Sequence, residues 1–497
     1  MTMNPKSRFR LLPISSVSLL VLVLQACTMV GPNYQSPTIS TPDAWAEKIS
    51  RQVAQGKGSS LQSWWTIFND PVLDNLIEQC RQENLDIKIS ISRIRQSRAM
   101  LAIAKGEEQP LANAAASAAR SKLSDDGVLQ QVAPADGFSG QNVFQLGLDA
   151  AWEIDVFGRV RRTIEAAGAG YQASIEDYRD VLVTLFAEVA IAYLDARTAQ
   201  QQIAIARSNA EDQSHSLALT QDRYNSGISS KLDVVQAKAN LAVTQAAIPP
   251  LDIAYNQAVN RLAVLLGQNA GSLQEAFTKA APIPKPAKNI DAGVPADVLR
   301  QRPDIRKAER LLAAQTAEIG VATASLYPRF GLSGFFGLQS RTPGNLFDSS
   351  SVTWGFGLPV QWNIFSGGRV RGNIKVQEEI AQQLLLQYQN KVLAAIEEVD
   401  NAIMAYNLNR QRLDKLQEAT EASREAVDMV LVQYNTGLTD FNNVLVTQRD
   451  LYSQQSQQLA TEAQAMLNIV SLYKALGGGW DLQQPSAETD SPGRVEE

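Results

Sequence analysis

The chain contains one pattern twice, at a nearly constant distance along the sequence. Residues 146–161 and 356–371, which are 210 positions apart, both carry a Gly-Leu pair, a tryptophan two residues before an isoleucine, and a closing Gly-Arg-Val-Arg. Residues 86–110 return as 304–328, at a distance of 218, so the first copy must contain eight more residues in a later loop. Repeated units normally stack because one unit cannot bury its apolar face alone. The duplication therefore predicts a component of an assembly.

Both copies predict long strands that have one apolar and one polar face. Apolar residues alternate over Val352–Ile364, and the first copy repeats this phase over Phe144–Ile154. Each run is about 11–13 residues long, whereas strands of soluble proteins cluster near 5–6 residues and barrel strands need about 9–11. Partner strands are expected at Leu111–Ala119 and Phe330–Gln339. Four strands cannot close a barrel in lipid, where barrels have at least about eight, so the sequence predicts a barrel shared between chains.

Long helices follow the strands in each copy. The stretches Val160–Arg223 and Val370–Tyr434 contain no proline, and each predicts a helix of roughly 90 Å at 1.5 Å per residue. Shorter helices are expected at Leu85–Lys105, Lys231–Leu266, Asp304–Thr323 and Phe441–Leu476. Their lengths suggest pairs of short helices stacked end to end beside each long one. Pro249 and Pro250 predict a break in the first return helix, which Leu459 and Ala460 at the equivalent place do not.

The start of the chain, 1–26, reads as a targeting segment. Three basic residues precede the apolar run Leu11–Leu24, which is too short for a permanent membrane helix. The run ends in Leu-Gln-Ala-Cys at Cys27, which resembles the cleavage box of bacterial lipoproteins. That resemblance implies a lipidated Cys27, and Thr28 favours the outer membrane as its destination. An ordinary signal peptide with a chance cysteine is the alternative.

The composition argues against several other classes of protein. The net charge is −6, and removal of the leader's three basic residues makes it −9, so the chain has no general attraction to nucleic acid. One histidine, His215, and one further cysteine, Cys80, do not supply a usual transition-metal site. No nucleotide loop or nucleophile–base motif is present. We therefore expect neither a cofactor nor an enzyme.

Four stretches together resemble one family, the outer-membrane efflux proteins of TolC type, in particular their NodT-like lipoprotein branch. They are Gly31–Pro37, Trp64–Leu73, Glu153–Arg159 and Arg302–Glu309. The resemblance implies a homotrimer with a twelve-stranded transmembrane β-barrel, four strands from each chain, continued by a twelve-helix α-barrel across the periplasm. An equatorial collar would be built from the chain ends and a Pro-rich insert. The implied partners are a periplasmic adaptor protein, an inner-membrane pump of the RND type and the lipid of the outer membrane.

On this basis the chain divides into six segments. They are a lipoprotein signal peptide (1–26), a lipid anchor and collar segment (27–84), repeat 1 (85–267), an equatorial insert (268–302), repeat 2 (303–477) and a C-terminal tail (478–497).

The resemblance also implies a gate at the periplasmic helical tips, which are here the two Tyr-Asn-x-Gly turns. The candidate gate residues are Tyr224, Gly227, Asp233, Tyr434, Gly437, Asp440, Asn443, Val446 and Arg449. Asn443 and Val446 stand where some members carry pore-narrowing aspartates, and Thr439 stands where an arginine can pair across chains. We therefore expect a gate that is closed by packing of Leu445 and Val446 and by hydrogen bonds of Tyr434 and Asn443, with Asp440 as a substitute charge.

The expected function is passive export of small molecules, such as drugs or amphiphiles, from the adaptor and pump to the exterior. Two alternatives stay open at this point. The chain could be the outer component of a type I protein-secretion or metal-efflux system, or a structural envelope lipoprotein that conducts nothing. A water-filled tunnel selects its cargo weakly, so the sequence does not identify the substrate.

Overall fold

The computed structural model forms two compact units. One unit is built from residues 1–37, 95–173 and 309–387, and the other from residues 38–94, 174–308 and 388–497. The residues that the structure describes are 29–38, 42, 45–46, 53–54, 61–122, 124, 140–286, 290–291 and 299–481. The predicted leader, Cys27 and most of the predicted tail lie outside these ranges. Among the described residues, no helix combines the length and the hydropathy needed to cross a membrane.

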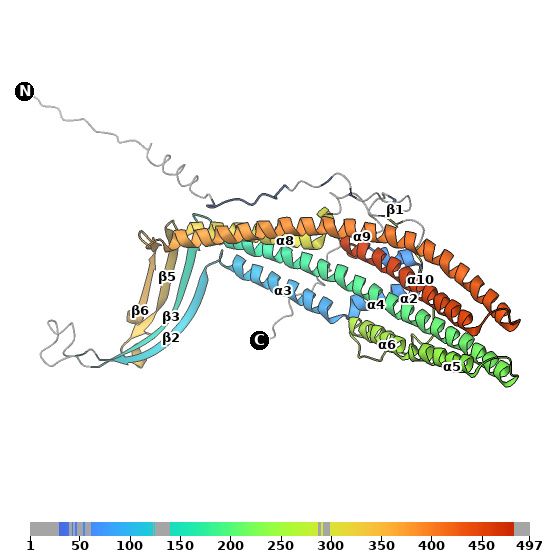
Figure 1. Cartoon of the computed structure of the whole chain (residues 1–497). Coiled ribbons are helices and arrows are strands. Elements are labelled where there is room, and N and C mark those ends of the chain that lie inside the picture. The colour runs from blue at the N-terminus through green and yellow to red at the C-terminus, as the bar shows by residue number, and fades with distance from the viewer. Residues whose placement is uncertain are drawn as a thin grey trace, which may run out of the picture. The chain divides into compact units, whose positions relative to one another are not determined.

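The first unit contains one antiparallel sheet that joins the strands of both copies (Figure 1). Strand β2 (Leu111–Ser121) pairs with β3 (Gln141–Ile154), β3 pairs with β5 (Arg329–Ser340), and β5 pairs with β6 (Val352–Gly357). The first three strands have 11, 14 and 12 residues. These lengths confirm the prediction of strands long enough for a membrane barrel.

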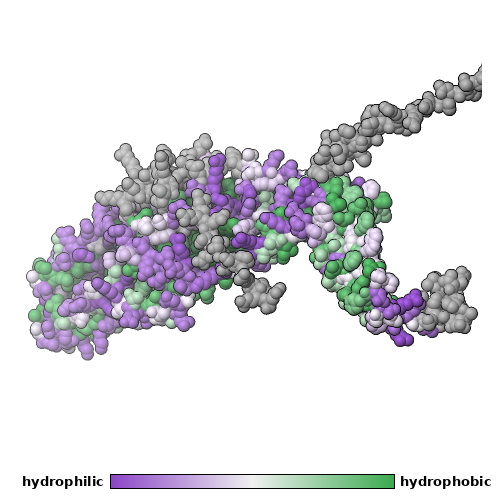
Figure 2. All heavy atoms as spheres, turned by 180° about the vertical axis from the view of Figure 1, so that it is seen from behind, coloured by the Kyte–Doolittle hydropathy of each residue, from purple (hydrophilic) through white to green (hydrophobic). Residues whose placement is uncertain are grey.

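The register of the sheet gathers the alternating apolar residues on one face. Leu148 is the partner of Phe336, which is the partner of Trp354, and cross-strand partners share a face. These three side chains are 60%, 58% and 66% exposed in the single chain. Figure 2 shows hydrophobic residues gathered over the strands. A patch of this kind on one chain indicates contact with lipid or with another protein.

The last strand differs from the prediction of one continuous run over Val352–Ile364. Strand β6 ends at Gly357, and a short strand β7 (Val360–Gln361) resumes the pairing with β5. The gap falls at Pro359 because proline has no N–H to donate to the hydrogen-bond ladder between the strands. Its carbonyl still accepts a hydrogen bond from the Gly331 N–H at 2.9 Å. The edge of the sheet therefore continues past the proline in an interrupted form.

Two tryptophans occupy equivalent places in the two copies, Trp152 near the end of β3 and Trp362 directly after β7. The indole N–H of Trp152 donates to the Glu108 carbonyl at 3.0 Å, and that of Trp362 donates to the Leu326 carbonyl at 3.0 Å. Both acceptors follow the short helix of their own copy. An indole ring with one polar partner and an exposed apolar body is typical of the membrane interface.

The helices confirm the predicted lengths and the predicted break. The long helices α4 (Arg159–Asn225) and α9 (Arg369–Asn435) have 67 residues each and lie at equivalent places in the two copies. The first return helix is divided into α5 (Lys231–Ala246) and α6 (Ile248–Leu265), so that Pro249 and Pro250 fall in the first turn of α6. Proline is tolerated there because those N–H groups have no partner within the helix.

The second return helix and the short helices are continuous. Helix α10 (Phe441–Ala475) runs for 35 residues without a break. The short helices α3 (Leu85–Gly106) and α8 (Pro303–Ala324) have 22 residues each. Short helices of equal length in the two copies fit the predicted α-barrel, whose wall would then have a uniform height.

In the first copy, Asn84 joins a return helix to a short helix. Its Nδ2 donates to the Leu265 carbonyl at the end of α6 at 2.8 Å, and its Oδ1 accepts from the Ile87 N–H at the start of α3 at 3.1 Å. Asn84 therefore satisfies a carbonyl of one helix end and an N–H of the next. This contact confirms end-to-end stacking in the first copy.

Arg302 lies at the equivalent position in the second copy. Its Nη1 donates to the Ala475 carbonyl at the end of α10 at 2.7 Å, and its Nε and Nη2 donate to the Asp304 carboxylate in the first turn of α8 at 3.0 and 2.9 Å. Glu398 of α9 accepts from Nη1 at 2.8 Å. The second copy therefore makes the same junction with a buried ion pair.

The core of the second unit lies where α2 (Pro71–Glu83) packs against α4, α6 and α10. Trp64 is fully buried and stacks on Tyr473 with ring centroids 5.6 Å apart. Cys80 lies in the same cluster, where burial raises the pKa of its thiol to about 12. Cys80 is therefore a packing residue and not a reactive one.

The insert and the chain ends meet in the second unit. Strand β1 (Val53–Ala54) pairs in parallel with β4 (Ile290–Asp291) of the insert. The Gly479 N–H donates to the Leu61 carbonyl at 2.8 Å. These contacts bring together the segments from which a collar was expected.

Candidate functional site

Each long helix ends in the same turn. Gly227 and Gly437 adopt φ values of 73° and 79°, which favour glycine. After the first, the Ile228 N–H donates to the Arg223 carbonyl at 2.9 Å, and after the second, the Leu438 N–H donates to the Gln433 carbonyl at 2.8 Å. These bonds form Schellman motifs, which satisfy the last carbonyls of α4 and α9. The two Tyr-Asn-x-Gly sequences are therefore the tight tips of two helical hairpins.

Asp233 belongs to the cap of α5 at the first tip. Its Oδ1 accepts from the Ser230 hydroxyl at 2.9 Å, and its Oδ2 accepts from the Ser229 hydroxyl at 3.0 Å. The Asp233 N–H in turn donates to the Ser230 Oγ at 3.3 Å. Ser230 is therefore the side-chain N-cap of α5, and the Asp233 carboxylate holds its hydroxyl in place. Tyr224, on the preceding turn of the same tip, is 40% exposed.

Tyr434 is the centre of a small core at the second tip. It is buried with Phe441 and Leu445 of α10 and with Ala237 of α5. The rings of Tyr434 and Phe441 are 5.3 Å apart. The cluster joins both hairpins of the chain, so movement of one tip away from the other exposes this core.

The Tyr434 hydroxyl is buried without a hydrogen-bond partner among the described residues. The predicted hydrogen bond of Tyr434 is therefore not made within the described part of the chain, where its ring packing holds the tip. Arg223, which no sequence motif singled out, covers this ring. Its guanidinium carbon lies 4.7 Å from the ring centroid, and its Nη1 donates to the Asn435 carbonyl at 2.9 Å. The one sequence feature that could have indicated a role for Arg223 is its position directly before Tyr224.

The polar residues at the start of α10 mainly cap that helix. Asp440 is its N-cap and accepts from the Asn443 N–H at 3.2 Å. The Asn443 side chain donates to the Thr439 hydroxyl at 2.7 Å. A negative charge at a helix N-terminus is stabilised by the helix dipole. The role of Asp440 as a substitute gate charge stays a prediction.

Val446 and Arg449 point away from the core of the tip. Val446 is 46% exposed, whereas its neighbour Leu445 is buried. Arg449 is exposed and makes no ion pair within the described ranges. Side chains placed in this way are available to the tunnel or to a neighbouring chain, and their part in a gate stays a prediction.

A second functional surface is the polar face of the sheet. Across the strands it carries Asn113, Asp149, Ser333 and Thr353, while the opposite face carries most of the exposed apolar residues of the sheet. The Asn113 side chain donates to Asp149 Oδ2 at 3.0 Å, and the Ser117 hydroxyl donates to Gln145 Oε1 at 3.4 Å. In a membrane barrel the apolar face meets lipid and the polar face meets water.

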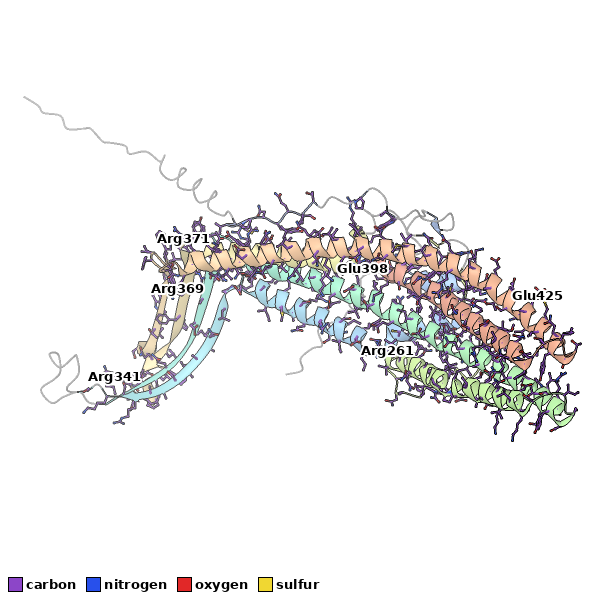
Figure 3. The ribbon with its side chains drawn as sticks, in the orientation of Figure 1. Arg261, Arg341, Arg369, Arg371, Glu398 and Glu425 are labelled. Atoms are coloured by element: carbon purple, nitrogen blue, oxygen red, sulfur yellow. The ribbon has the colours of Figure 1, made fainter. Side chains whose placement is uncertain are left out.

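Basic residues lie where the long helices begin. Arg369 and Arg371 lie in the first turn of α9, next to the strand ends of the same unit (Figure 3). In the first copy, Arg159 donates to Glu153 Oε1 at 2.9 Å and to Glu107 Oε2 at 3.0 Å. Cations at this level are suited to phospholipid headgroups.

The model of the family described as "Outer membrane efflux protein" matches residues 76–268 and 294–478, which is more than half of the chain. This chain belongs to the outer membrane efflux protein family. The two matched segments contain the two copies of the repeat. Nodulation protein T of Rhizobium leguminosarum bv. trifolii is 32% identical over 467 residues, which cover 93% of this chain and 96% of that protein. The solvent efflux pump outer membrane protein SrpC of Pseudomonas putida is 31% identical over 486 residues, with coverage of 96% and 100%.

A solved structure of the outer-membrane channel OprN has the same fold. It superimposes with a TM-score of 0.85 at 36% identity, and the match covers 91% of this chain and 99% of that one. These likenesses confirm the predicted architecture of a trimer with a β-barrel and a periplasmic helical barrel. They also confirm the outer membrane as its location. The efflux protein is thus the outer-membrane exit duct of an efflux system that includes an adaptor and a pump.

Proposed function

We propose that this duct exports small amphiphilic organic molecules, which an RND-type pump delivers through a periplasmic adaptor. The observation that carries the proposal is the polar face of the sheet, which has few charged residues between its ends and is lined mainly by small, amide and hydroxyl side chains. Such a face holds water without a strong field that excludes neutral or amphiphilic solutes. The similarity to a solvent efflux protein supports the same class of cargo.

Two exposed apolar residues support a docking place for the adaptor at the tips. Ile228 and Leu438 follow the Schellman glycines of the two tips and are 65% and 81% exposed. The residue at this position commonly packs back on its own helix. Its exposure in both copies provides an apolar contact for a partner.

We also propose that a lipidated Cys27, which lies outside the described residues, anchors the mature chain. Arg162, whose side chain is 1% exposed, donates from Nε to the Val30 carbonyl at 3.1 Å and from Nη2 to Asn33 Oδ1 at 2.7 Å. The segment after the cysteine is thereby held against the start of α4.

Complementation of a deletion strain tests the proposed function. The wild-type gene should restore export of a fluorescent amphiphilic dye only when its adaptor and pump are present. A strain that exports the dye equally well without this chain would contradict the proposal.

Leu438→Asp tests the adaptor contact in the same strain. We expect it to abolish dye export while trimers still assemble in the outer membrane. Phe347→Asp is the matched control, because Phe347 is 76% exposed in the turn between β5 and β6, outside the tips. Equal export by the two variants would exclude the tip as the adaptor contact.

A further inference from the structure

One level of the polar face brings a carboxylate and an aromatic ring together. At this level Asn113, Asp149, Phe335 and Gly355 are partners across four strands. The neighbouring rows contain mainly small residues. They are Ala115, Gly147, Gly337 and Thr353 on one side, and Leu111, Ala151, Ser333 and Gly357 on the other. Asp149 and Phe335 therefore project from the wall between two shallower rows.

Asp149 is the one charged residue in the middle of this face, counting the strands that the structure describes. The other charged residues on the face are Glu153 and Arg329, close to the helical ends of their strands. Glu153 is paired with Arg159, with 2.9 Å between Oε1 and Nε. The carboxylate of Asp149 has no cation beside it within the described strands, and the bond from Asn113 to Oδ2 fixes its orientation.

Phe335 lies against the backbone of Gly355. A Cβ atom at Gly355 would lie 2.7 Å from Cε1 of the Phe335 ring, so only glycine leaves room for this placement. The Phe335 side chain is nevertheless 52% exposed. Part of the ring is therefore open on the polar face, next to the carboxylate of its cross-strand partner Asp149.

We propose that Asp149 and Phe335 form a binding site for organic cations, one site in each protomer, on the lumen side of the barrel. A carboxylate attracts the positive charge, and an aromatic ring attracts a cation with apolar substituents, such as a quaternary ammonium group. A small inorganic cation gains little from the ring and keeps its water. The site gives the duct a weak preference for cationic amphiphiles, and it rests on the proposed function because it requires the polar face to line a conducting path.

Block of single-channel current by benzyltrimethylammonium tests the site. Purified trimers are placed in a planar bilayer, and the cation is added on the side of the strand loops. From the usual strengths of exposed ion pairs and cation–π contacts, Asp149→Asn and Phe335→Leu should each weaken the block by about threefold. Block by benzyl alcohol, which has the ring without the charge, should be weaker than block by the cation in the wild-type protein and unchanged by Asp149→Asn.

Two variants serve as matched controls. Asp149→Glu keeps the carboxylate and should keep most of the block. Phe336→Leu removes the neighbouring ring, which lies on the apolar face, and should leave the block unchanged. Migration as a folded trimer on a gel confirms that each variant is assembled.

The outcomes separate this proposal from the proposed function. Channels that conduct normally but are blocked equally in wild type, Asp149→Asn and Phe335→Leu would overturn the cation site and leave the duct in place. Absence of block in the wild type would do the same. Assembled trimers without any current would contradict the conducting path, and the cation site with it.

Discussion

The junction between α10 and α8 provides the sharpest test of how the helical wall is held together. The Arg302 side chain is 8% exposed and that of Asp304 is 14% exposed. Burial raises the pKa of the Asp304 carboxyl, but the hydrogen bonds and charge of Arg302 outweigh burial and hold this pKa below its usual value. Replacement of Arg302 by methionine removes four hydrogen bonds from the junction.

Loss of one partner of a buried ion pair costs about 3–5 kcal/mol. Asp304 retains a contribution from Lys391, which also lowers its pKa, so we expect the lower end, about 3 kcal/mol. Helix melting of the trimer in detergent, followed by circular dichroism, should show a lower midpoint for Arg302→Met. Lys415→Met is the control, because the ion pair of Lys415 with Glu418 is exposed on both sides and solvent screening leaves such pairs little effect on stability.

The double variant Arg302→Met, Asp304→Leu distinguishes the cost of a buried carboxylate without its partner from the cost of a general packing defect. Removal of both partners of a buried pair is often nearly neutral, so the double variant should melt above the single one.

The pH dependence of the stability that Asp304 contributes has a defined sign. Because the folded pKa of Asp304 is depressed, its contribution is present above the unfolded value and is lost as the pH falls through the folded pKa. Equal melting of Arg302→Met and Lys415→Met at neutral pH would refute this account of the junction.

Two further predictions concern the second tip. Tyr434→Phe should leave stability unchanged or raise it by up to about 1 kcal/mol, because the buried hydroxyl has no partner among the described residues; a large loss of stability on thermal melting would show that the hydroxyl is paired in the trimer. Val446→Asp should increase the preference of the channel for cations, measured as the reversal potential in a salt gradient. An unchanged reversal potential would show that Val446, despite its 46% exposure, does not line the pore.

Much of the fold could be predicted because its signals are local and repeated. The absence of proline from two long stretches, together with the glycine turns, defined α4 and α9 closely. The alternation of apolar residues defined β3. The same pattern failed at Pro359, where apolar neighbours on both sides suggested a continuous strand although the missing N–H interrupts the ladder.

The contacts that are made over long distances in the sequence could not be predicted in this way. Asn84 and Arg302 occupy equivalent positions and make the same junction, yet one is an amide and the other a guanidinium. The guanidinium of Arg223, in the first copy of the repeat, packs over the ring of Tyr434 in the second copy. Such contacts depend on how the copies pack, which the period of a single helix does not specify. The asymmetry of the gate residues between the two copies stays a prediction for the same reason.

The central claim is that the polar face of the sheet lines the pore while the apolar face meets lipid. Cysteine substitutions at Thr353 and Trp354, which are adjacent on β6, test it most directly. The native Cys80 adds little background, because it is buried and its pKa is raised to about 12. A charged, membrane-impermeant thiol reagent should lower the single-channel conductance of Thr353→Cys and leave that of Trp354→Cys unchanged. The reverse result, with current reduced only in Trp354→Cys, would contradict the account.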